Sequence, residues 1–225
     1  MKSIGVFGGA FDPVHTGHLR TAYEMLHELD LDELRFVPSL QPPHREPPIA
    51  SVEMRLDMLR AALPDNERML IDTRELERPG PSYSVDTLTS LRDEFPNVSL
   101  CLIIGMDAFL AFTTWHRWRE IFRIAHIVVA YRPGTDLPVT GAIGELLEAR
   151  KVPDKAGLAG AQSGRILIQP TTQLEISSSA IRRICGAGRD PRYLVPVSVL
   201  EIIMKTGCYA SPVRADDSQE NRFSA

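Results

Sequence analysis

The sequence predicts an α/β protein whose mainly parallel sheet is doubly wound, with helices on both faces and a small helical part at the C-terminal end. Short apolar segments alternate with segments of helical periodicity along most of the chain, which is the order expected of parallel α/β proteins. Residues 98–105 are apolar at nearly every position, as expected of a strand covered on both faces. A glycine-rich loop directly follows the first apolar segment, where a Rossmann-like fold binds its ligands.

The expected elements follow this order along the chain. Residues 4–7 form a β-branched and aromatic strand, and residues 19–26 then repeat apolar side chains at helical spacing. Residues 33–38 predict the second strand, and Ser51 is the expected cap of the next helix. Further strands are expected at residues 68–73, 98–105, 126–132 and 165–170, a helix capped by Ser84 at residues 84–95, and loops at residues 38–48, 132–141 and 154–164.

Length and composition bound the class of protein. A chain of 225 residues predicts one domain, here residues 1–209, followed by a polar and disordered tail at residues 210–225. The net charge of −4 argues against binding to nucleic acid or to a membrane surface. We expect a cytoplasmic protein, because the sequence has neither a signal peptide nor a long apolar run, and its three widely spaced cysteines suit packing in a reducing compartment. An oligomer is compatible with all of this.

The loop at residues 5–18 matches neither common phosphate-binding pattern. Its glycines lack the G-x-G-x-x-G spacing, and no lysine follows them as in G-x-x-x-x-G-K-[ST]. Gly8 and Gly9 permit close backbone approach, while His15 and His18 stand at the start of a helix whose exposed amides favour an anion. Each imidazole can donate a hydrogen bond to a phosphate oxygen without a permanent charge. Either histidine alone would also suit a cap or a packing position, and a zinc site would need a third ligand that is not nearby in sequence.

A second candidate anion site lies far downstream. Ser177, Ser178 and Ser179 stand at an expected helix start, and Arg182 follows one turn later. Ser177 is the natural cap, and the free amides, hydroxyls and guanidinium around it would surround an anion. A serine-rich helix start with a later arginine is also common as simple capping with a solvated charge. This pattern therefore gains weight only in combination with the first.

The stretch GGAFDPVHTGH resembles the signature G-x-F-D-P-x-H-x-G-H of the nucleotidyltransferase superfamily, and EISSSAIRR resembles its second signature. The resemblance implies that His15 and His18 bind ATP phosphates and stabilise the α-phosphorus during adenylyl transfer. It also implies that the second segment, with Arg182, holds the phosphates that leave as pyrophosphate. Mg²⁺ is implied on the phosphates, with no metal ligand from the protein. The catalytic candidates are thus His15, His18 and Arg182, and the ATP-binding candidates are Gly8, Gly9, Ala10, Phe11, Gly17, Gly105, Asp107, Ile176, Ser177, Ser178 and Ser179.

Three segments bear on the acceptor. His44 and Arg45 end a rigid proline-rich loop and could meet an acceptor phosphate, or form a solvated basic turn. Ser84 stands at a helix entrance, where main-chain amides could bind a carboxylate and where Ser84 could equally be a plain cap. Trp115 is the better candidate to stack on a flat heteroaromatic ring, whereas Trp118 is expected in the core.

These segments resemble the bacterial nicotinate-nucleotide adenylyltransferase family from Lys2 to about Tyr209, through PSLQPPHR, SYSVDTL, GMD and WHRW. The resemblance implies transfer of AMP from ATP to nicotinate mononucleotide, giving nicotinate adenine dinucleotide and pyrophosphate in NAD biosynthesis. Ser39 and Arg45 depart from the residues that relatives often carry. Two alternatives remain: another nucleotidyltransferase, such as one acting on phosphopantetheine, and a non-catalytic nucleotide-binding regulator. The implied nicotinate mononucleotide-binding residues are Ser39, His44, Arg45, Ser84, Val85, Trp115 and Arg132.

Overall fold

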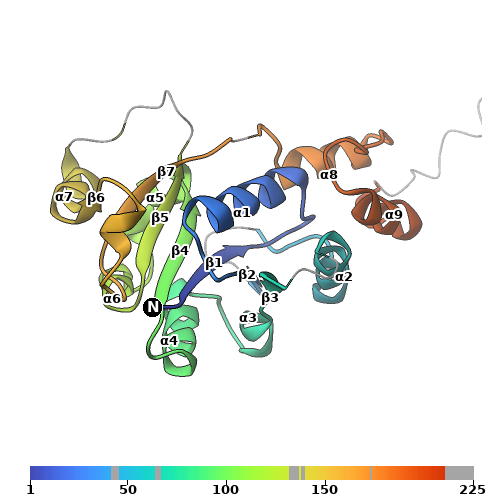
Figure 1. The fold of residues 1–225 in the computed structure, drawn as a ribbon. Helices are drawn as coiled ribbons and strands as arrows, with labels where there is room; N and C mark the ends of the chain where they lie inside the picture. The colour runs from blue at the N-terminus through green and yellow to red at the C-terminus, as the bar shows by residue number, and fades with distance from the viewer. Residues whose placement is uncertain (42–45, 64–66, 132–136, 138–139, 173, 211–225) are drawn as a thin grey trace, which may run out of the picture.

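A computed structural model of the protein shows a seven-stranded sheet between two layers of helices (Figure 1). The structure describes residues 1–41, 46–63, 67–131, 137, 140–172 and 174–210. The strand order is β3-β2-β1-β4-β5-β7-β6, and every pair of neighbouring strands is parallel. The strands are β1 Ser3–Gly9, β2 Glu33–Pro38, β3 Met69–Ile71, β4 Ser99–Gly105, β5 His126–Tyr131, β6 Lys151–Val152 and β7 Ile166–Pro170.

The helices connect these strands and complete the C-terminal part. α8 and α9 follow the last strand of the sequence and form the small helical part that the sequence predicts. The α-helices are α1 Thr16–Glu28, α2 Val52–Ala62, α3 Arg74–Glu77, α4 Ser84–Glu94, α5 Met106–Leu110, α6 Trp118–Ile124, α7 Gly141–Arg150, α8 Ser178–Gly186 and α9 Val197–Thr206, with 3-10 turns η1 Phe112–Thr114 and η2 Lys155–Leu158.

The central strand β4 contributes side chains to two separate cores. Cys101 and Ile103 belong to the core beneath α1, α2, α8 and α9, whereas Leu100, Leu102 and Ile104 belong to the core beneath α4, α5, α6 and α7. Successive side chains of a strand point to opposite faces, so a strand buried on both faces is apolar at every position. This explains the continuous apolar run in the sequence.

The strand order reverses between β1 and β4, and sheets of this kind bind their ligands at such a reversal. β1 pairs with β2 on one side and with β4 on the other, so the connections after β1 and β4 leave toward opposite faces. A crevice forms at the carboxyl ends of two such strands. The loop after β1, the segment after β2 and the start of α5 all lie at this edge of the sheet.

The predicted fold class is confirmed, two local expectations are wrong, and one short strand, β6, was not predicted. Ser84 is the first residue of α4 rather than its cap; Tyr83 occupies the cap position, and no described side chain caps the helix. The expected loop at residues 154–164 contains η2, whose Leu158 is buried. The two-residue strand β6 has too few residues to show a periodicity.

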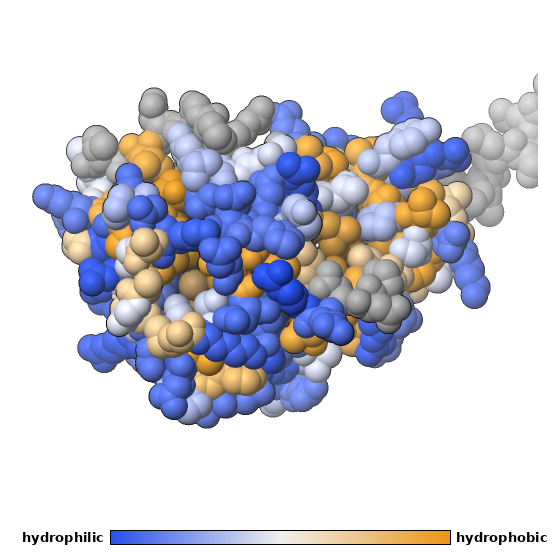
Figure 2. Space-filling model, viewed as in Figure 1, coloured by the Kyte–Doolittle hydropathy of each residue, from blue (hydrophilic) through white to orange (hydrophobic). Residues whose placement is uncertain are grey.

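The surface shows no large separation of polar from apolar side chains on the face seen in Figure 2. Apolar patches are spread over this face (Figure 2). On α9, Val197 and Met204 are exposed. Among the described helices, none combines the length and the apolar character needed to cross a bilayer.

Candidate active site

The loop after β1 leads directly into the N-terminus of α1, and His15 is the cap of that helix. The His15 Nδ1 atom accepts a hydrogen bond from the His18 amide at 3.3 Å. The His15 and His18 rings stack with their centroids 3.7 Å apart and their planes 23° from parallel. The expectation that the two imidazoles lie together is confirmed, and His15 serves as a cap as well.

Burial keeps His15 neutral. Its side chain is 5% exposed, and desolvation lowers the pKa of His15 to about 4. Because Nδ1 accepts the bond from His18, the proton of the neutral ring is on Nε2. His15 therefore presents an oriented N–H donor that carries no charge at neutral pH.

Gly17 makes room for this ring. A Cβ on Gly17 would lie 3.0 Å from both Cε1 and Nδ1 of His15, and 3.5 Å from the carbonyl oxygen of Ile176. A methyl group there would press on the imidazole. The close packing of the His15 ring thus favours glycine at this position, whereas the Ile176 oxygen would be at ordinary contact distance.

The second signature lies against the first, although the two are far apart in sequence. The Ser178 hydroxyl donates to the carbonyl oxygen of Pro13 at 2.9 Å. Arg182 donates through Nη1 to the carbonyl oxygen of Asp12 at 2.7 Å and through Nη2 to Ser179 Oγ at 3.3 Å. The start of α8 is thereby fixed to the loop after β1.

The two helix ends differ in the amides they leave available. At α1 the Thr16 amide donates to the carbonyl oxygen of Leu194, and the His18 amide is taken by His15. The expectation that the α1 amides are exposed to an anion is therefore wrong for these two. At α8 the Ser177 hydroxyl caps the Ala180 amide, as predicted. The first-turn amides of Ser178 and Ser179 have no acceptor within the helix, and the positive end of the helix dipole lies there.

A buried arginine of α2 holds the backbone of the glycine loop through hydrogen bonds. Arg55 of α2 donates through Nη1 to the carbonyl oxygens of Ala10 at 2.7 Å and Ser39 at 2.9 Å. A Cβ on Gly8 would meet no described atom within 4 Å, whereas one on Gly9 would lie 3.1 Å from the Phe11 ring. Gly8 therefore faces open space.

Three further ATP-binding candidates differ in what they present to a ligand. The Phe11 ring is buried and lies edge-on to His18 with centroids 5.1 Å apart. Only the backbone of Phe11 is left for a ligand. Gly105 ends β4 and Asp107 lies in the first turn of α5, and both are exposed. They stand at the carboxyl end of the strand that neighbours β1.

The acceptor candidates on α4 and near α6 lie close to one another. The rings of Tyr83 and His116 have centroids 4.4 Å apart, and Arg117 forms an ion pair with Asp86 of α4. The Trp115 segment therefore lies beside the first turn of α4.

The two tryptophans differ less than expected. Trp115 and Trp118 are both half-buried, and both contact Phe112, with centroids 5.3 and 6.0 Å apart. Trp118 alone also contacts Phe122. At α4, Ser84 is half-buried and the Val85 side chain is fully buried, so Val85 offers its main chain.

The remaining acceptor candidates are not equally placed for ligand contact. Ser39 is buried, its amide donates to the carbonyl oxygen of Gly9 at 2.9 Å and its hydroxyl to the same oxygen at 3.4 Å. These bonds give Ser39 a structural task between the ends of β1 and β2. His44, Arg45 and Arg132 lie outside the described residues.

No protein cage for a metal is present in the described part of the chain, where no cluster of three or more His, Cys, Asp or Glu side chains could hold an ion. The donors gathered at this site are imidazole, hydroxyl, amide and guanidinium groups, which suit an anion rather than a cation.

Sequence reasoning missed several residues that shape the site. Arg55 lies with Met58 and Leu59 on the buried face of α2. An arginine on an apolar helix face is a sequence signal that could have indicated a structural role for Arg55. Glu75 is buried, accepts from the Thr87 hydroxyl at 2.6 Å and, with Gly8 and Ser84, lines a cavity of about 20 Å³. Burial raises the pKa of Glu75. No short-range pattern indicates Glu75.

The sequence of this chain is similar to a known protein family and to several named proteins. The family model described as cytidylyltransferase-like matches residues 6–184. The chain is 50% identical over 208 residues to "Probable nicotinate-nucleotide adenylyltransferase" of Methylococcus capsulatus, covering 92% of this chain and 99% of the relative. It is 45% identical over 212 residues to the protein of the same name from Pseudomonas aeruginosa, covering 94% and 99%.

Solved structures share the fold at low sequence identity. The nicotinic acid mononucleotide adenylyltransferase of Plasmodium falciparum, solved in complex with NaAD, superposes with a TM-score of 0.69 at 16% identity, over 93% of this chain and 98% of that one. A putative nicotinate-nucleotide adenylyltransferase of Vibrio parahaemolyticus gives a TM-score of 0.65 at 17% identity, over 94% and 98%.

Proposed function

The chain belongs to the nicotinate-nucleotide adenylyltransferase family of cytidylyltransferase-like proteins, and from this premise we propose that it transfers AMP from ATP to nicotinate mononucleotide. A phosphate oxygen of the acceptor attacks the α-phosphorus of ATP in line. The bond from that phosphorus to the oxygen bridging to the β-phosphate breaks, and pyrophosphate leaves. The product is nicotinate adenine dinucleotide, an intermediate of NAD biosynthesis.

One observation carries the proposal: the two signature segments meet in a single site. The Ser178–Pro13 and Arg182–Asp12 hydrogen bonds join residues that are 165 and 170 positions apart in sequence. Such an arrangement supports a triphosphate held between the α1 entrance and the α8 N-terminus. Charge that develops on its oxygens in the transition state would meet donors already in position, which is the main source of catalysis in such sites.

The roles of the side chains follow from their chemistry. The neutral His15 donates from Nε2, and His18 lies against it, so the two imidazoles are assigned to the oxygens of the α-phosphoryl group. Arg182 and the amides of Ser178 and Ser179 are assigned to the β- and γ-phosphates, where negative charge accumulates on the leaving group. Magnesium enters with the triphosphate as part of the substrate, bound to phosphate oxygens.

The acceptor site is assigned to the first turn of α4 and the Trp115 segment beside it. First-turn amides of a helix bind a carboxylate well, which favours nicotinate over the uncharged nicotinamide. The Tyr83–His116 contact supports this assignment because it brings the segment with the half-buried Trp115 to the same helix end. Trp115 is the residue assigned to stacking on the pyridine ring.

The test is pyrophosphate release from Mg-ATP with three acceptors in parallel: nicotinate mononucleotide, nicotinamide mononucleotide and phosphopantetheine. We expect the highest kcat/KM with nicotinate mononucleotide. A preference for phosphopantetheine would identify a different transferase. Binding of ATP without pyrophosphate release with any of the three would favour the non-catalytic regulator.

A further inference from the structure

The carboxylate of Asp12 connects three parts of the chain at the edge of the phosphate site. Its side chain is buried, and its Oδ1 accepts from the Tyr209 hydroxyl at 2.7 Å and from the Ala50 amide at 3.0 Å. Its Oδ2 accepts from the Ile49 amide at 2.8 Å and lies 3.5 Å from Arg182 Nη1. A buried carboxylate is tolerated only when it is well supplied with donors, and four donors surround this one.

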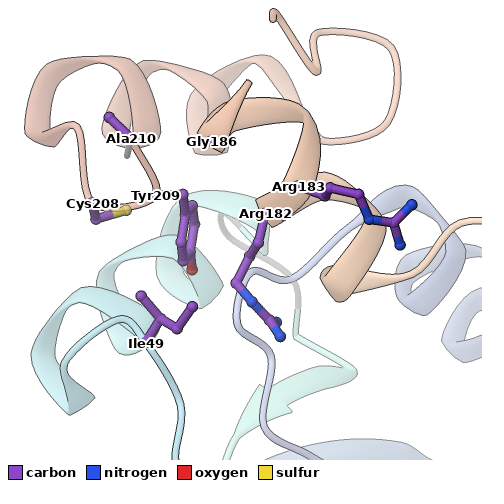
Figure 3. A pocket seen from close by; sticks show the side chains of 7 residues that line it. All are labelled: Ile49, Arg182, Arg183, Gly186, Cys208, Tyr209 and Ala210. Carbon is purple, nitrogen blue, oxygen red and sulfur yellow. The ribbon is translucent and has the colours of Figure 1, made fainter. Parts of the chain in front are cut away.

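The Arg182 guanidinium lies beside this carboxylate and donates its hydrogen bonds to two other acceptors. It is 26% exposed, and it lines a cavity of about 470 Å³ together with Ile49, Tyr209 and four other residues. Figure 3 shows the Arg182 and Tyr209 side chains running in the same direction beside this cavity, with the Arg183 guanidinium pointing away from Tyr209. A long side chain that borders so much space is not fixed by packing. Its guanidinium is held toward the loop after β1 by hydrogen bonds to the main-chain carbonyl oxygen of Asp12 and to Ser179 Oγ, with the Asp12 carboxylate 3.5 Å away.

Tyr209 is suited to hold Asp12 in place. It lies three residues beyond the end of α9 and is buried, so its ring has a fixed position. Burial, together with the neighbouring Asp12 carboxylate, raises the pKa of Tyr209. The hydroxyl therefore remains protonated and donates to the carboxylate at every pH at which the enzyme would work.

We propose that Tyr209 is a positioning residue of the phosphate site, which acts through Asp12 to hold the Arg182 guanidinium toward the β- and γ-phosphates of ATP. This inference rests on the proposed function for the identity of the ligand. Tyr209 satisfies part of the Asp12 carboxylate, so that Arg182 does not have to neutralise it fully. Without the hydroxyl, the carboxylate draws Arg182 into a closer ion pair and away from the phosphates.

The test is a double-mutant cycle read by direct binding of Mg-ATP in calorimetry, with no acceptor present. Tyr209→Phe removes only the hydroxyl, and we expect it to weaken ATP binding about tenfold, the scale of one hydrogen bond to a charged group. In an Arg182→Ala background the same substitution should have no further effect on ATP affinity, because Tyr209 acts through that guanidinium. Tyr193→Phe is the matched control, since Tyr193 is 87% exposed and should leave the affinity unchanged.

Two results would overturn the inference: unchanged ATP affinity in Tyr209→Phe, or equal losses in the wild-type and Arg182→Ala backgrounds, which would mean a structural role only. If Tyr209→Phe does not fold, it is combined with Asp12→Asn, which leaves no carboxylate charge to draw Arg182 inward. The double variant should then bind Mg-ATP with an affinity near that of the wild type, and a loss of about tenfold would overturn the inference. An enzyme that binds ATP but does not use nicotinate mononucleotide would refute the proposed function while leaving this cycle readable.

Discussion

Exchanging His15 for Asn or Gln separates the two tasks that this residue performs. The Asn carboxamide oxygen can take the place of Nδ1 and accept from the His18 amide, and Asn is a good helix cap, but it brings no donor to the Nε2 position. The longer Gln can bring an N–H near that position and gives up the cap. His15→Asn should therefore preserve the fold and lose activity, whereas His15→Gln should lose stability and retain more activity.

The magnitude follows from the burial of the ring. A shift in the pKa of His15 from 6.5 to about 4 corresponds to about 3 kcal/mol against charging it. At pH 7 only about one molecule in a thousand would carry an imidazolium at His15, so the donor is the neutral ring. Removing one oriented transition-state donor costs about 10²- to 10³-fold in kcat, which is the loss expected for His15→Asn.

The assay is pyrophosphate release with Mg-ATP and nicotinate mononucleotide, with the free energy of unfolding of each variant measured in urea. We expect His15→Gln to lose about 1 kcal/mol of stability through the missing cap and to exceed His15→Asn in kcat by at least about tenfold. A His15→Asn enzyme with kcat near that of the wild type would refute the role of His15 as a donor. It would leave His15 as a helix cap only.

Four further outcomes are expected. Gly17→Ala should lower kcat about tenfold by displacing the His15 ring, and an unchanged kcat would show that the ring position is not critical. His18→Ala should lower kcat at least about a hundredfold with an unchanged melting temperature, and turnover near the wild-type rate would contradict its assignment. Trp115→Ala should raise the KM for nicotinate mononucleotide by an amount equivalent to about 1 to 3 kcal/mol, with Trp118→Ala as the control that mainly lowers stability; an unaltered KM would move the ring elsewhere. Because the folded-state pKa of His15 is lowered, its contribution to stability is full above pH 6.5 and is lost as the pH falls toward 4, so urea unfolding should show a smaller acid loss in His15→Asn, and equal losses would contradict the pKa shift.

The sequence pattern was sufficient for the architecture because the central strands β4 and β5 are buried on both faces. The apolar run of β4 indicated the parallel sheet, which the structure confirms. The glycine loop after β1 indicated the ligand-binding edge, which stays a prediction. The strand β6 was not predicted because it is defined by its partner strand and not by a local sequence pattern. Its two residues pair with β7, Lys151 with Ile166 and Val152 with Leu167.

The two signature segments of the site could be predicted from the sequence, but the residues that hold those segments in place could not. The two signature segments are local patterns, whereas Arg55 bonds two separate loops and Tyr209 bonds Asp12 across 197 positions of sequence. Such contacts arise only when the sheet and the C-terminal helices pack together. Ser84 was assigned as a cap because serine favours that position, but the chain enters α4 one residue earlier, at Tyr83.

The most direct test of the central claim is a crystal structure of this protein with Mg²⁺ and a non-hydrolysable ATP analogue. The account predicts that one triphosphate lies within hydrogen-bonding distance of His15 and His18 and, at its other end, of Ser178, Ser179 and Arg182. A triphosphate that contacts only one of these two segments, or that binds away from both, would contradict it.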